Sequence, residues 1–307
     1  MGQYISATVL ALGFLSAPAF ATFLPPNDLA KEDGLLRGSQ VTEADFNDVI
    51  DAAEAYYRPL ISTLYRSNLV VKRLWDKSTV NAMAMRAGSE WKVEMYGGLA
   101  RRPEITKDGF ALVLCHEIGH HLAGYPFVPG GGISLFGMSR DWAANEGQSD
   151  YFASQACARQ LWRNDLALNA SYAESISQIP RAACDQVWDS TADRNLCYRI
   201  MTAAESLGAM ASSSERNPAK WSTPSQRVVR KTENGHPDAQ CRLDTYGAGA
   251  LCDRDFNANE IPGIELDKKS RNGAAAEKEA SRTSCMRAEN YELGWRPTCW
   301  FKPLIDG

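Results

Sequence analysis

The hydrophobic residues of this chain are spaced mostly as in helices, and in one stretch as in strands. Between Phe46 and Leu64 they recur every three or four positions, and Thr42 offers a side-chain cap before them. From Leu69 to Arg101, β-branched and aromatic residues alternate with polar ones, which predicts two or three antiparallel strands. The pattern therefore predicts an α+β fold, mostly helical around a small antiparallel sheet.

Three later segments are also predicted to be helical. The first is apolar and runs from about Lys107 to Ala123, where Gly124 ends it. After a loop that contains the glycine-rich run 129–132, a second helix is expected over about 141–162. Residues 171–212 are expected to be largely helical as well.

The composition changes after Cys252. Residues 268–284 are rich in charged and small side chains, which predicts a surface helix or a loose segment. Residues 295–301 are too apolar for a free tail, so we expect them to dock on the body through a disulfide of Cys299. The predicted organisation is one domain, residues 22–255, with a C-terminal extension, residues 256–307, docked on it.

The chain starts with an apolar run, Tyr4 to Ala17, followed by the small-residue pattern Ala19-Phe20-Ala21. This predicts a signal peptide over residues 1–21 and a mature protein that is periplasmic or secreted. A membrane anchor is the poorer alternative, because about 14 apolar residues are too few to span a bilayer comfortably. The net charge of −4 comes with no basic surface signature, so we expect no nucleic-acid partner.

The apolar helix carries His116-Glu117-Ile118-Gly119-His120, which reads H-E-x-x-H. Residues spaced i, i+4 project from one face of a helix, so His116 and His120 can ligate one tetrahedral Zn²⁺. Glu117 then lies beside the metal, where it can take a proton from a zinc-activated water and pass it to a leaving amine. A pair of satisfied core histidines is the alternative, and a third ligand decides against it.

That third ligand is offered by the segment 145–150, which reads N-E-x-x-S-D. Glu146 and Asp150 are spaced i, i+4, so both carboxylates point the same way. One of them can complete a His₂Glu catalytic zinc site, and the other can accept the free N–H of a zinc-bound imidazole. A solvated acidic helix face is the alternative for this pair taken alone.

A third motif, H-P-x-x-x-x-R, spans His236 to Arg242. The ordered set H-E-x-x-H, E-x-x-x-D and H-P-x-x-x-x-R resembles the HtpX- and BepA-type peptidases, relatives of the CAAX prenyl proteases and members of the gluzincins. Upstream, Asn81-Ala82-Met83-Ala84 and Tyr96-Gly97-Gly98-Leu99 are similar to that family's Asn-Ala-x-Ala and strand-Gly-Leu patterns. The resemblance covers roughly residues 70–160 and 225–245, and it implies a zincin-like fold.

The resemblance also implies the roles of the site residues. His116, His120 and Glu146 would hold one Zn²⁺ per chain. Glu117 would be the base and Asp150 the partner of a zinc-bound imidazole. In the next motif, His236 and Arg242 would stabilise the oxyanion from the other side. In some periplasmic relatives this histidine also caps the zinc and holds the enzyme latent, so by resemblance His236 would be catalyst, inhibitor or both. A turn histidine before Pro237 is the alternative.

Zincins commonly bind an extended peptide along the last strand before the active-site helix. The candidate here is Trp91 to Gly98, with Val93, Met95 and Gly97 along its edge. An ordinary covered strand is the alternative.

Eight cysteines in an exported chain indicate disulfides. The close pairs 184/197, 241/252 and 285/299 are candidates, although spacing does not fix connectivity. Cys115 and Cys157 are not expected to pair, because Cys157 lies about 16 Å along a helix beyond Glu146 while Cys115 adjoins a ligand. Cys115 is therefore predicted to be a buried thiol.

The sequence thus predicts an exported zinc endopeptidase acting on polypeptides. One alternative is a binding or chaperone-like module with structural zinc, although such a site has no need of the base Glu117. Another is a zinc amide hydrolase that acts on peptidoglycan.

Overall fold

The computed structural model describes residues 21–32, 38–129, 141–213, 217–287 and 293–305. Residues 1–20 of the predicted signal peptide and the glycines at 130–132 lie outside these ranges. The elements are, in chain order, β1 (Ala21–Thr22), η1 (Leu29–Glu32), α1 (Glu43–Tyr65), β2 (Asn68–Leu74), β3 (Ala82–Ala87), β4 (Glu90–Tyr96), α2 (Gly97–Ala100), α3 (Lys107–Leu122), α4 (Glu146–Phe152), the π-helix η2 (Ala153–Ala158), α5 (Arg159–Trp162), α6 (Leu166–Ser171), η3 (Tyr172–Glu174), α7 (Gln178–Val187), α8 (Thr191–Ala211), α9 (Ala239–Ala250) and α10 (Ala274–Ala280).

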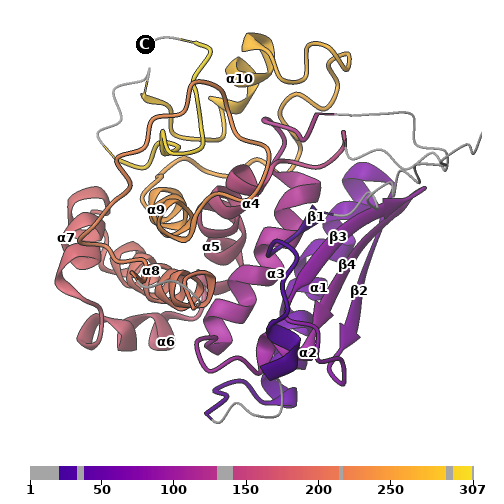
Figure 1. Ribbon diagram of the computed structural model, residues 1–307. Helices are drawn as coiled ribbons and strands as arrows, with labels where there is room; N and C mark the ends of the chain where they lie inside the picture. The colour runs from indigo at the N-terminus through magenta and orange to yellow at the C-terminus, as the bar shows by residue number, and fades with distance from the viewer. Residues whose placement is uncertain (1–20, 33–37, 130–140, 214–216, 288–292, 306–307) are drawn as a thin grey trace, which may run out of the picture.

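Helix α3 lies in the middle of the molecule, between the sheet with α1 on one side and helices that include α4 and α8 on the opposite side (Figure 1). It contacts α1 and the sheet on one flank and α4, η2 and α8 on the other. Every residue from Asp108 to Leu122 is buried, including the polar residues of the H-E-x-x-H motif. Thr106 caps its first turn, and Gly124 follows its end with φ 68°.

The fold class is confirmed as α+β, but the sheet is mixed rather than purely antiparallel. Its strand order is β1-β3-β4-β2, with β2 and β4 parallel. The β3–β4 hairpin is antiparallel, as predicted. The difference arises because the segment after β2 crosses the end of β4 before β3 begins. Strand β3 then runs opposite to β2, and the hairpin turns β4 back so that it is parallel to β2 and lies between β2 and β3.

The passage over β4 explains the two adjacent glycines after that strand. A Cβ atom on Gly97 would lie 1.8 Å from the carbonyl oxygen of Trp75, and one on Gly98 would lie 2.1 Å from that of Ser78. Gly98 also donates its N–H to the carbonyl of Lys77 at 2.8 Å. Only glycine allows the two backbone segments to approach this closely.

The prediction that residues 91–98 form an open substrate edge is wrong. Strand β4 pairs with β3 on one side and β2 on the other, so its backbone groups are used in the sheet. Val93 and Met95 are fully buried, and Gly97 already belongs to α2. Strand β3, which packs on α3, lies on the side of β4 away from β2, and within the described residues its outer edge pairs with the short strand β1.

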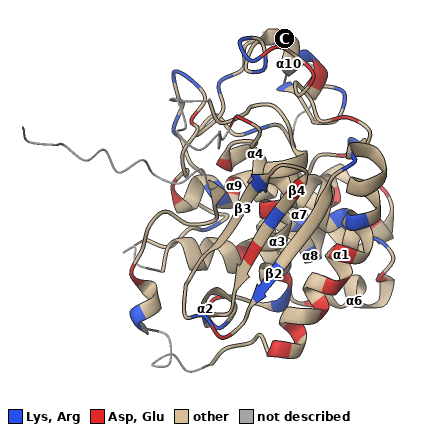
Figure 2. Ribbon diagram, turned by 90° about the vertical axis from the view of Figure 1, so that its right-hand side faces the viewer, with Lys and Arg blue, Asp and Glu red and all other residues tan. Residues whose placement is uncertain are grey.

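One face of the sheet packs on α1 and α3, while the other carries charged side chains (Figure 2). Lys72 and Glu94, which are opposite each other in β2 and β4, form an ion pair of 2.5 Å on this face. The alternating apolar and polar residues of the sequence therefore correspond to the two faces of this sheet, with the apolar ones on the helix side and the polar ones on the other.

The predicted helices are present, with one boundary shifted. Thr42 caps α1 in a capping box with Asp45, as expected. The second ligand helix starts at Glu146, five positions later than the sequence suggested. The reason is that Asn145 caps it, and the preceding Ala144 pairs through its backbone with His120 and with Phe127. Among the described residues, no helix has the length and apolar character needed to cross a membrane.

All eight cysteines are paired. The predicted 184–197 disulfide is present, whereas the other two close pairs are exchanged for 241–299 and 252–285. The prediction of a free Cys115 is wrong as well, since it is bonded to Cys157 with a Cα–Cα distance of 5.5 Å. The second ligand helix, α4, and η2 pack side by side with α3. Residues beyond Glu146 therefore return along α3 towards Cys115 instead of diverging from it.

The C-terminal segment is part of the core. Cys299 forms a disulfide, as expected, and Trp300 is fully buried. The Trp300 ring lies directly on α4, where a Cβ atom on Gly147 would be only 2.3 Å from it. Residues 229–233 run beside residues 298–302, with Glu233 donating to the carbonyl of Trp300 at 2.8 Å.

Candidate metal centre

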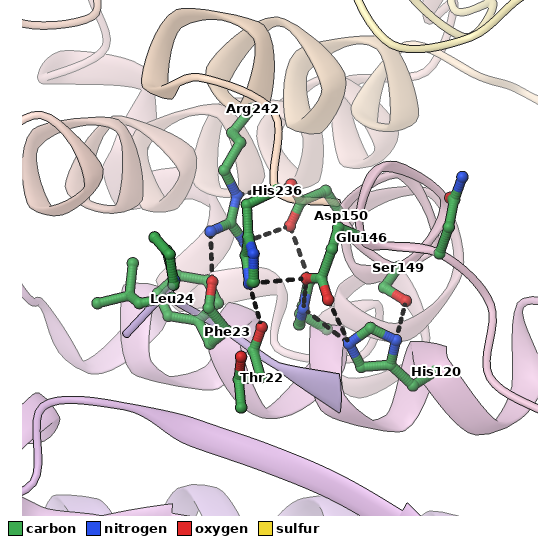
Figure 3. Close-up of polar contacts among 12 residues, drawn as sticks. Thr22, Phe23, Leu24, His120, Glu146, Ser149, Asp150, His236 and Arg242 are labelled. Carbon is green, nitrogen blue, oxygen red and sulfur yellow. Dashed lines mark hydrogen bonds and ion pairs between the residues drawn. The ribbon is translucent and has the colours of Figure 1, made fainter. Parts of the chain in front are cut away.

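Three buried side chains from α3 and α4 converge on one point. His116 and His120 lie one turn apart on α3, and Glu146 is the first residue of α4. Their ligand atoms all lie within 4.8 Å of one another. His116 Nε2 is 3.1 Å from His120 Nε2 and 3.3 Å from Glu146 Oε2, and His120 Nε2 is 3.8 Å from Glu146 Oε1 (Figure 3). This group could bind a metal ion.

The hydrogen bonds of the two imidazoles support that role. The far nitrogen of His120, Nδ1, lies 2.8 Å from the carbonyl oxygen of Ala144, to which it donates. The other ring nitrogen, Nε2, then carries no proton, and its lone pair faces Nε2 of His116. Burial lowers the pKa of His120 to about 4. The imidazole is therefore neutral and free to donate its lone pair to a cation.

The carboxylates around His116 stabilise a positive charge at its imidazole. Burial opposes protonation, but the charges of Asp150 and Glu146 outweigh it and raise the pKa of His116 to about 9. The same surroundings lower the pKa of Glu146 to about 2, because the three neighbouring histidines outweigh its burial. Two nitrogens and a carboxylate that attract a positive charge to one buried point fit a divalent metal ion.

Asp150 fixes the orientation of His116. Its Oδ1 atom accepts from His116 Nδ1 at 2.7 Å, so the other imidazole nitrogen faces the ligand cluster. Arg242 donates to both oxygens of Asp150 at 2.8 Å, and the hydroxyl of Tyr246 donates as well. Although burial works to raise the pKa of Asp150, Arg242 and His116 hold it well below its ordinary value. The carboxylate is therefore ionised and locked in place.

Arg242 is placed behind the ligands rather than in front of them. Its guanidinium contacts Asp150, and its Nη1 atom donates to the carbonyl oxygen of Phe23 at 2.5 Å. The side chain is almost fully buried. The structure thus brings Arg242 to the centre, as predicted, and its direct contacts are with Asp150 and the N-terminal segment.

Glu117 is fully buried, and neither of its carboxylate oxygens has a hydrogen-bond partner in the described part of the chain. Burial, helped by the negative charge of Glu146, raises the pKa of Glu117 to about 8 against the attraction of His116. A carboxyl group with such a pKa can both accept and release a proton near neutral pH.

His236 reaches the same centre from the loop that precedes α9. Its Nε2 atom lies 3.5 Å from Glu146 Oε2 and 2.6 Å from the carbonyl oxygen of Thr22, to which it donates (Figure 3). All seven predicted metal, base, partner and oxyanion residues therefore gather at one place. The residues predicted along β4 do not take part, because β4 lies in the interior of the sheet.

Sequence reasoning missed several residues of this centre. Tyr246 lies one turn after Arg242 on α9, so its spacing could have placed it on the same helix face as Arg242, where its hydroxyl donates to Asp150. Ser149, whose hydroxyl is 3.0 Å from His120 Nδ1, follows the ligand Glu146 by three positions. Thr22 and Phe23 carried no such signal, because nothing in the local sequence links them to residues 236–242.

Comparisons of the chain with protein-family profiles, with curated proteins and with solved structures found no match.

Proposed function

We propose that this protein is an exported zinc endopeptidase of the gluzincin type, similar to the HtpX and BepA peptidases. The observation that carries the proposal is a buried unpaired carboxylate, Glu117, next in sequence to a ligand of the His116–His120–Glu146 cluster. A set of two imidazoles and one carboxylate favours Zn²⁺, which would polarise a peptide carbonyl and acidify water.

The chain's own residues then divide the work of amide hydrolysis. Glu117 takes a proton from the attacking water and gives it to the leaving nitrogen, because neither of its oxygens is engaged by another group in the described part of the chain. His236 donates a hydrogen bond to the oxygen of the attacked carbonyl, as its Nε2 now does to Thr22. Asp150, held by Arg242, keeps His116 in the tautomer that presents Nε2 to the metal.

A purely structural zinc site is the rival function, and Glu117 argues against it. An ionisable group that is buried without a partner costs stability, and a structural site has no use for one. The same cost is reasonable in an enzyme, where such a group serves catalysis.

The four disulfides indicate an oxidising, non-cytoplasmic location. We infer that residues 1–21 are a signal peptide and that the mature protein starts at Thr22. Its location is then the periplasm or the extracellular space, and its substrates are polypeptides that are exposed there.

Casein digestion by the oxidised, zinc-loaded chain 22–307 tests the proposal. We expect cleavage by the wild type and a loss of about a thousandfold or more in Glu117→Gln, with zinc content unchanged. Glu277→Gln is the matched control, because Glu277 is also fully buried with one unpartnered carboxylate oxygen. Equal casein cleavage by wild type and Glu117→Gln would contradict the proposed role of Glu117.

A further inference from the structure

The segment Ala21–Leu24 lies against β3 as an added antiparallel strand beside the metal centre. Ala21 and Thr22 pair with Ala84 and Met83, and Phe23 donates its N–H to the carbonyl of Ala82 at 3.1 Å. The Asn81 side chain then binds both backbone groups of Leu24, accepting from its N–H at 2.9 Å and donating to its carbonyl at 3.0 Å. Every residue of this short segment is therefore held through its backbone, which is independent of side-chain identity.

Residues of the H-P-x-x-x-x-R motif hold the two successive carbonyl groups of this segment (Figure 3). His236 donates to the oxygen of Thr22 at 2.6 Å, and Arg242 donates to that of Phe23 at 2.5 Å. The same His236 nitrogen is 3.5 Å from the ligand Glu146. The Thr22 carbonyl therefore accepts a hydrogen bond from His236, the residue proposed above to donate to the attacked carbonyl of a substrate.

The Phe23 side chain fills a fully enclosed space next to the same residues. Its ring is edge-on to the ligand His116 at 5.4 Å, and the Arg242 guanidinium lies over it at 4.3 Å from its centre. The ring has no exposed surface. This space is lined by an imidazole edge and a flat cation, and it suits an aromatic side chain in shape and electrostatics.

We propose that residues 22–24, the first three of the inferred mature chain, are an internal occupant of the substrate site. On this basis, which rests on the proposed function, substrates add to β3 as an extended strand in the place of this segment. The residue before the cleaved bond presents its carbonyl to His236, and a large aromatic residue directly after that bond takes the place of Phe23. The substrate class is therefore an extended peptide with Phe, Tyr or Trp following the cleaved bond.

The occupant must leave before a substrate can enter. It is held by backbone bonds to β3 and Asn81, by the donors His236 and Arg242, and by the buried ring of Phe23. A substrate strand with an aromatic side chain at the same place would replace all of these contacts. The segment therefore lowers the affinity for substrates by competing with them from within the same chain.

Peptide binding tests this without relying on catalysis. The probe is a fluorescent peptide with the sequence of residues 21–25, and the protein carries Glu117→Gln and zinc. We expect a chain that begins at Pro25 to bind the probe at least about tenfold more tightly than the chain that begins at Thr22. The probe with Phe23→Ala should bind the Pro25 chain about tenfold or more weakly. Equal affinity of both chains for the probe would overturn the inference.

A point variant guards against a truncated chain that does not fold. In the chain from Thr22, Phe23→Ala weakens the internal segment while leaving the rest of the chain intact, so the probe should bind more tightly than to the parent. Unchanged affinity would overturn the inference. Failure of both variants to fold, seen by circular dichroism, would overturn it too, because a displaceable occupant is not required for folding.

The outcomes also separate this inference from the proposed function. Phe-dependent probe binding without any casein cleavage by either chain would support the occupied site and refute the peptidase. Casein cleavage with no enrichment of aromatic residues after the cut bonds would support the peptidase and refute the proposed substrate class.

Discussion

Glu117 is an ionisable residue that the fold buries without giving its oxygens a partner. Its pKa is about 8 in the folded protein and near the ordinary value of 4.5 when unfolded. Between those two values the folded state keeps a proton that the unfolded state has lost. The free energy of unfolding must therefore fall as the pH rises through this window.

Glu117→Gln removes that pH-dependent cost. For the metal-free protein at pH 8.5 we expect the variant to be more stable than wild type by on the order of 2–4 kcal/mol, with a smaller difference at pH 5. Urea unfolding at both pH values measures it, with the exposed Glu265→Gln as control. A difference that does not change with pH would show that Glu117 is ionised in the folded protein throughout.

Asp150 and Arg242 are a buried ion pair, so each depends on the other. Arg242→Met leaves the Asp150 carboxylate without its main counter-charge and should cost about 3–5 kcal/mol of unfolding free energy. Adding Asp150→Asn removes that charge, and the double variant should recover part of the loss. Urea unfolding of wild type, the two single variants and the double variant gives the coupling free energy between Asp150 and Arg242. If the loss of unfolding free energy in the double variant equalled the sum of the two single losses, the pairing would be contradicted.

The single variant Asp150→Asn has a separate effect on the metal. Because Asp150 holds the His116 imidazole, its replacement should weaken zinc affinity by about ten- to a hundredfold. A competition titration against a zinc chelator measures this, with Glu265→Gln as the unchanged reference.

At the scale of elements, the sequence predicted what depends on near neighbours. The ligand turn of α3, the i, i+4 pair on α4 and the Thr42 cap follow from helical spacing within a few residues. The parallel β2–β4 pairing, the 115–157 disulfide and the approach of Phe23 to Arg242 depend on residues far apart in the chain. Spacing carries no information about such contacts. The disulfide prediction failed because it used the distance along one helix and not the side-by-side packing of α3 with α4 and η2.

The passage of residues 75–79 over the end of β4 is an element-scale feature that can be tested. Gly98→Ala would push a methyl group against the backbone of Ser78, which cannot move without disturbing the β2–β3 connection. We expect a loss of about 3 kcal/mol or more in unfolding free energy. Gly235→Ala is the control, since no atom lies within 4 Å of its added methyl group. Thermal or urea unfolding that ranks the two variants equally would contradict this account.

At the scale of the whole molecule, the metal centre draws on both ends of the described chain. Phe23 and Thr22 cover one side of it, the loop before α9 brings His236, and Trp300 supports the ligand helix α4 from behind. The disulfide of Cys299 to Cys241 ties this last support to α9, the helix that carries Arg242. The C-terminal segment therefore contributes to the position of Glu146, although none of its described residues belongs to the candidate metal-binding cluster.

Trp300→Ala tests that contribution. Loss of a fully buried indole should cost about 3–5 kcal/mol of unfolding free energy, because α4 cannot close over the space left beside Gly147. Zinc affinity should fall as well, since Glu146 stands directly before Gly147 in the unsupported turn. Leu304→Ala, at an exposed position of the same segment, should change both by little. If Trp300→Ala lowered stability while zinc affinity stayed at the Leu304→Ala level, the C-terminal segment would stabilise the fold without positioning the metal ligand.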